Sequence, residues 1–159
     1  GYVTDSVRQM VFESGFPGMK VFEFAFDSRD TGCAGDYLPH NYPVNSVVYT
    51  GTHDNATLIG WYQDIPKEGR EMLRDYIHDY VTSDRSLHWS VICRVMGSPA
   101  RICMIPMQDY LGLDNTCRIN TPSTLGTNWK WRLAKSDLTE DLKQEIHGMT
   151  LRYGRMNWN

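Results

Sequence analysis

Blocks of apolar and polar residues divide the chain into short strands and longer helices. Three apolar runs rich in β-branched or aromatic residues, 19–26, 45–50 and 100–107, predict strands. The first run is apolar nearly throughout, which is typical of a strand covered on both faces. Apolar residues at helical spacing predict helices from the cap at Thr4 to Gly15, from Leu58 onward, from Pro66 to Ile77, over 87–96 and over 138–153.

Strands that alternate with helices in this way predict β-α-β units and a parallel sheet. Three strands leave two unpaired edges, which makes a poor independent domain and allows self-association through those edges. The 159 residues also fall short of the about 250 of a complete (β/α)8 TIM barrel. We therefore predict an α/β fold that is part of such a barrel, formed by residues 1–159 without a separate second domain.

Polar side chains follow the middle strand where it ends. Gly51 forms a turn, and His53 and Asp54 come directly after it. In an α/β barrel the carboxyl ends of the strands carry the chemistry, so these two residues are the first candidates for a site. A structural interpretation stays open, in which Asp54 or Asn55 caps the next helix and His53 is a satisfied structural histidine.

Composition restricts the classes of function. The net charge of −3 gives no basic footprint for nucleic acid or an anionic membrane, and no run approaches the roughly 18 apolar residues of a membrane span. The first residues lack a signal-peptide pattern, which predicts a cytoplasmic protein. The four cysteines form no C-x-x-C pair, so reduced thiols are expected rather than a zinc site. An aromatic content of 12% is compatible with carbohydrate binding.

Five short motifs give the chain a family resemblance. They are FPGMKV at 16–21, YLPHNYP at 37–43, YTGTHDN at 49–55, IPMQD at 105–109 and NTP at 120–122. In this order and at these intervals they resemble the 4-α-glucanotransferases, also called amylomaltases or disproportionating enzymes. The resemblance covers the chain from Gly1 to its C-terminus. It implies an α-amylase-like barrel, of which the chain holds about the last three strands, and retaining transfer of α-1,4-glucan segments between maltooligosaccharides.

The resemblance also implies roles for single residues. Asp54 matches the carboxylate that stabilises the oxocarbenium-like transition state, and His53 matches a neighbour that binds the same sugar. Asn120 is implied as a further substrate-binding residue. Asp27 is a substrate-binding candidate by its place in the polar loop after the first predicted strand, and a solvated loop acid stays the alternative. The nucleophile aspartate and the acid/base glutamate of the family precede Gly1, so the segment alone is expected to be inactive and to need the N-terminal part of the same barrel. No metal or organic cofactor is implied.

Three positions leave questions open. Ala56 stands where the family commonly has an aspartate, which removes an acceptor near the site. Ser123 stands where the family usually has a glycine after the NTP motif, and its side chain restricts the backbone there. Asp109, at the end of the third predicted strand, either caps a helix or contacts substrate.

Two other functions compete with the transferase. A non-catalytic glucan-binding module would use exposed tryptophans; Trp61 and Trp89 lie at helical spacing, which favours core packing, whereas Trp129 and Trp131 lie beside a polar loop. A metal-dependent hydrolase would use His40, His53, His78 and the cysteines, but their spacing matches no known ligand set.

Overall fold

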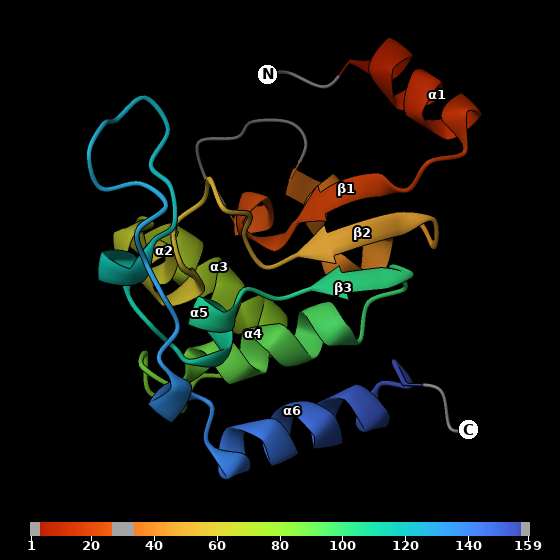
Figure 1. The fold of residues 1–159 in the computed structure, drawn as a ribbon. Helices are drawn as coiled ribbons and strands as arrows, with labels where there is room; N and C mark the ends of the chain where they lie inside the picture. The colour runs from red at the N-terminus through yellow and green to blue at the C-terminus, as the bar shows by residue number, and fades with distance from the viewer. Residues whose placement is uncertain (1–3, 27–33, 157–159) are drawn as a thin grey trace.

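A computed structural model describes residues 4–26 and 34–156 of the chain. Three strands, β1 (Gly18–Val21), β2 (Ser46–Tyr49) and β3 (Ile102–Met104), form a parallel sheet in the order β1-β2-β3. This is the parallel α/β arrangement that the sequence predicts, and Figure 1 shows α4 and α6 layered along one side of the sheet while α1 stands apart from the rest.

Five of the helices below begin and end close to where the apolar spacing predicts, and the short α5 is not predicted. They are α1 (Asp5–Ser14), α2 (Leu58–Asp64), α3 (Lys67–Ile77), α4 (Leu87–Met96), α5 (Met107–Tyr110) and α6 (Glu140–Arg152). Threonine side chains at positions 4, 57 and 139 accept a backbone N–H of the first turn of α1, α2 and α6. Local capping chemistry therefore sets the start of three of these helices.

Two of the predicted strands are wrong in length. The chain leaves β1 after Val21 and forms a 3-10 helix over Phe22–Phe26, which turns Phe22 and Phe26 into the core, 6.3 and 6.4 Å from the Trp61 ring. The run 100–107 is a strand only over Ile102–Met104. Pro106, which has no N–H to donate to a sheet, then immediately precedes α5.

The core lies on one face of the sheet. Val48 of β2 is fully buried and packs in a cluster with Leu58, Leu73 and Ile92 from α2, α3 and α4. Trp61 belongs to this cluster and Trp89 packs against it, which confirms the core interpretation of both tryptophans.

The opposite face of the sheet is open. Val47 of β2 pairs with Met19 of β1 on one side and with Ile102 of β3 on the other, so the three residues form one row across the sheet. The side chains of Met19, Ile102 and Met104 are 61%, 44% and 50% exposed. The prediction that the β1 strand is covered on both faces is thus wrong within the described residues. A parallel sheet with helices on one face and an apolar, exposed other face fits part of a barrel, because in a complete barrel the inner faces of the strands cover one another.

Candidate functional site

The turn after β2 fixes the two residues that the sequence singles out. The Asn55 carboxamide oxygen accepts hydrogen bonds from the Thr52 backbone N–H at 3.0 Å and the Thr52 hydroxyl at 2.6 Å. The Thr52 hydroxyl oxygen in turn accepts from the Asp54 N–H at 3.3 Å. The N-cap of α2 is Thr57, so the interpretation of Asp54 or Asn55 as that cap is wrong.

Three of the four predicted site residues come together at this turn. The Asn120 carboxamide donates to Oδ1 of Asp54 at 2.6 Å, and the His53 imidazole Nε2 lies 3.3 Å from the same oxygen. The Asn120 backbone N–H donates to the His53 carbonyl at 3.2 Å. The Asp54 and His53 side chains are 49% and 53% exposed, so both can reach a ligand. The fourth residue, Asp27, lies outside the described residues.

A loop between η4 (Asn115–Cys117) and α6 holds this arrangement in place. The Arg118 guanidinium donates through Nη2 to the Asp54 carbonyl at 2.7 Å and through Nε to the Asn120 carbonyl at 2.9 Å. The Trp129 ring lies 5.2 Å from the His53 ring and is 57% exposed. No local sequence pattern marks Arg118, whose contact with Asp54 crosses 64 positions.

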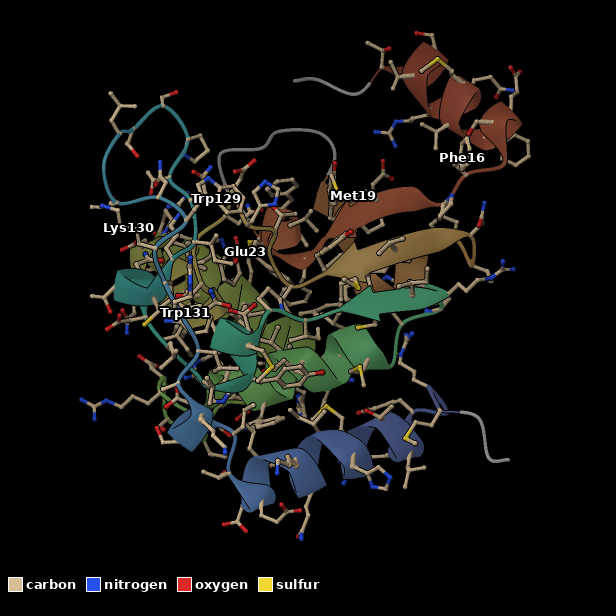
Figure 2. All side chains as sticks on the ribbon, in the orientation of Figure 1. Phe16, Met19, Glu23, Trp129, Lys130 and Trp131 are labelled. Atoms are coloured by element: carbon tan, nitrogen blue, oxygen red, sulfur yellow. The ribbon has the colours of Figure 1, made fainter. Side chains whose placement is uncertain are left out.

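A mainly apolar hollow of about 540 Å³ opens beside His53 and Asp54. Its walls include Trp131 from the loop and Met19 from the open face of the sheet. In Figure 2 the loop that carries Trp129 and Trp131 lies on one side of Glu23 and Met19 on the other. Apolar walls with a carboxylate and an imidazole at the rim suit a ring that has apolar faces and polar edges.

The buried Asp109 carboxylate links Thr50 and Leu58, which flank the turn that carries His53 and Asp54. Asp109 is 1% exposed and accepts hydrogen bonds from the Thr50 hydroxyl at 2.5 Å and the Leu58 N–H at 2.8 Å. Burial raises the pKa of Asp109 to about 6, although both hydrogen bonds favour its ionised form. Asp109 thus lies inside α5, whose N-cap is Pro106, and its carboxylate binds the first N–H of α2 instead of capping the helix that follows β3.

A second buried acid lies against the turn. Glu23 is 3% exposed, and its Oε1 has no hydrogen-bond partner among the residues that the structure describes. Burial, followed by the neighbouring charge of Asp109, raises the pKa of Glu23 well above its ordinary value, and Arg118 opposes this shift. A Cβ at Gly51 would lie 2.7 Å from that Oε1, so a side chain at position 51 would displace the Glu23 carboxyl.

The histidines of the metal hypothesis have other contacts. Nδ1 of His40 lies 3.0 Å from the Tyr76 hydroxyl, and His78 ends α3 in a left-handed conformation. Over residues 4–26 and 34–156 no group of three histidine, cysteine, aspartate or glutamate side chains is placed to hold a metal ion. Trp129 and Trp131, in contrast, do lie at the site.

The fold and the site define a partial parallel α/β barrel with a carboxylate, an imidazole and a carboxamide gathered beyond the carboxyl end of its middle strand. A family model described as 4-alpha-glucanotransferase matches residues 1–139. The chain belongs to this family, which confirms the resemblance found in the motifs.

Named relatives support the assignment. The chain is 42% identical to a 4-alpha-glucanotransferase of Clostridium butyricum and 40% identical to one of Synechocystis, over 98% of its own length in each case. It covers 31% and 30% of those two proteins, so it spans less than a third of the relatives it matches. A relative from rice, 39% identical, is a chloroplastic/amyloplastic 4-alpha-glucanotransferase.

Solved structures agree with the partial barrel. An amylomaltase from Streptococcus agalactiae in complex with acarbose superposes with a TM-score of 0.90 at 33% identity, over 99% of this chain and 31% of that one. An amylomaltase from Corynebacterium glutamicum, 15% identical and with a TM-score of 0.57, shares the fold. The predicted fold class is therefore confirmed.

Proposed function

We propose that the complete protein containing this segment is a 4-α-glucanotransferase that transfers α-1,4-glucan segments between maltooligosaccharides with retention of configuration. The observation that carries the proposal is the half-exposed Asp54 carboxylate, held by Asn120 and His53 beside the hollow. Family membership supports the reaction, and the acarbose complex of a similar amylomaltase supports an oligosaccharide as the ligand.

In this proposal Asp54 stabilises the transition state. A retaining transfer passes through oxocarbenium-like states, and a fixed carboxylate beside the ring offsets the developing positive charge. Both polar contacts of the Asp54 side chain within the described segments reach Oδ1. They orient the carboxylate so that Oδ2 can accept a sugar hydroxyl, while His53 binds the same sugar. Asn120 holds Asp54 and also binds substrate, and Asp27 contacts an outer sugar.

The covalent chemistry needs two further carboxyl groups. A nucleophile forms the glycosyl-enzyme, and an acid protonates the leaving oxygen and then deprotonates the acceptor hydroxyl. We assign both to the N-terminal part of the barrel. The segment alone is then inactive, and no metal or organic cofactor takes part.

The test is disproportionation of maltotriose by the complete protein. The products expected are glucose and longer maltooligosaccharides. Asp54→Asn should lower turnover about 100-fold or more, because it removes a charge aimed at the transition state, and should leave the melting temperature unchanged. Asp141→Asn, an exposed aspartate on α6, is the matched control and should retain turnover. Near-normal turnover of Asp54→Asn would refute the assignment.

A glucan-binding module is the second candidate, favoured by the exposed Trp129 ring against His53. It predicts that maltoheptaose changes tryptophan fluorescence while maltotriose yields no transfer products.

Location is a separate matter. Within the described parts of the chain no helix has both the length and the apolar character to cross a membrane. The cytoplasmic location stays a prediction, since the named relatives include a chloroplastic enzyme.

A further inference from the structure

Arg118 and Asn120 form hydrogen bonds with the turn that carries His53 and Asp54, mostly to its backbone carbonyls. Arg118 donates to the carbonyl of Asp54, and Asn120 donates to both the carboxylate of Asp54 and the carbonyl of His53. Arg118 also donates to the Asn120 carbonyl. The guanidinium therefore links the turn after β2 to the loop at Asn120: Nη2 binds the Asp54 carbonyl, and Nε binds the Asn120 carbonyl.

We infer that Arg118 is a positioning residue, which fixes the Asp54 carboxylate by holding the Asp54 backbone and the Asn120 backbone in one planar fork. The inference rests on the proposed function of Asp54. Catalytic groups act only when held to within about 0.5 Å of the productive geometry. Asp54 stands in a turn with a half-exposed side chain, so its position depends on these contacts across the loop.

The surroundings explain why the guanidinium binds carbonyls. A cavity of about 30 Å³ borders Arg118 and is also lined by Ala56, Thr57 and Asp109. Ala56 offers no side-chain acceptor, and Asp109 already accepts from Thr50 and Leu58. Among the described residues, the hydrogen-bond acceptors of the Arg118 guanidinium are the carbonyls of Asp54 and Asn120.

The chemistry of arginine suits this task. The guanidinium is planar and always charged, and it presents its donors in a rigid fork. A lysine at position 118 would keep the positive charge, but its single ammonium cannot reproduce the two directed bonds. Arg118→Lys should therefore retain part of the effect, and Arg118→Gln should retain less.

The test is a double-mutant cycle in the complete protein, with kcat and KM measured on maltotriose. Arg118→Gln should lower kcat about 10- to 100-fold with KM changed less than about twofold, because displacement of a catalytic group is felt mainly in the transition state. In the Asp54→Asn background the same substitution should lower kcat less than about twofold, since the group it positions has lost its charge.

Arg155 supplies the matched control. Its guanidinium also binds backbone carbonyls, those of Met96, Ser98 and Ala100 at 2.7 to 3.0 Å, and none of these residues belongs to the proposed site. Arg155→Gln should lower the melting temperature and leave kcat per folded molecule unchanged. Arg118→Gln should lower kcat even at temperatures where the protein is fully folded.

The outcomes separate the two proposals. An equal loss of kcat from Arg118→Gln in the wild-type and Asp54→Asn backgrounds would show a merely structural role and overturn the inference, as would an unchanged kcat. Absence of transfer by the wild-type protein, or full turnover of Asp54→Asn, would instead overturn the proposed function and remove the basis of the inference.

Discussion

Replacement of Thr50 by valine tests whether the buried Asp109 carboxylate organises the site segment. Thr50 is fully buried, and its hydroxyl donates to Asp109 at 2.5 Å. Valine has nearly the same shape but no donor, so the buried carboxylate keeps only the Leu58 N–H among the described donors. Loss of a hydrogen bond to a buried charged group costs about 1.5–3 kcal/mol. We expect Thr50→Val to lower the unfolding free energy by that amount at neutral pH.

The cost should depend on pH in a definite direction. Burial raises the pKa of Asp109 from 3.8 to about 6, so the folded protein holds a proton that the unfolded chain has released between these values. The contribution of Asp109 to stability therefore falls as pH rises through this window. The Thr50 hydroxyl favours the ionised carboxylate, so its removal raises the pKa of Asp109 further. The stability loss of Thr50→Val should be largest above the pKa of Asp109 and should shrink to about 1 kcal/mol at pH 5, where the bond joins two neutral groups.

The assay is thermal unfolding of the complete protein at pH 5 and pH 8. Thr150→Val is the control, because the Thr150 hydroxyl donates to the Ile146 carbonyl within α6 and involves no carboxylate. Its effect should be the same at both pH values. Equal losses for Thr50→Val at pH 5 and pH 8, or no loss at either, would refute the role assigned to Asp109.

Three substitutions to or from glycine test local packing and backbone conformation. Gly60→Ala should lower the melting temperature by an amount equivalent to about 1–3 kcal/mol, because its Cβ would lie 2.2 Å from Oδ1 of Asn115. Gly148→Ala is the control and should raise the melting temperature, because its Cβ would lie in open space. A rise in both variants would contradict the packing argument. Ser123→Gly should raise the melting temperature by the equivalent of at most about 1 kcal/mol, because Ser123 has a φ of 63°, which glycine adopts without strain. A lower melting temperature would show that Ser123 is not strained.

Local signals in the sequence predict the helices well and the strands less well. Caps such as Thr4 and Thr57 are local chemistry, and apolar spacing of 3.6 residues is visible over ten or more positions. The run 22–26 is apolar enough for either a buried strand or a tight helix. Its conformation follows from the packing of Phe22 and Phe26 against Trp61, which lies more than thirty positions away in the chain.

The same limit applies to the site. His53 and Asp54 could be predicted because they directly follow a strand, and Asn120 was implied by the family resemblance. The contacts of Arg118 with Asp54 and of Asp109 with Leu58 cross 64 and 51 positions, so no local pattern contains them. Ser123, which departs from the family pattern, has the left-handed backbone that a glycine would favour.

The open face of the sheet has a consequence for chimaeric enzymes. If this segment replaced its counterpart in a relative about 40% identical, the peptide junction would be a simple join, but Met19, Ile102 and Met104 would meet strands selected to fit other side chains. In such a hybrid the mismatch therefore lies in the side-chain packing inside the barrel and not at the peptide junction. Transplanting the segment together with the residues that face these three positions would keep the donor packing intact, even though those residues lie elsewhere in the gene.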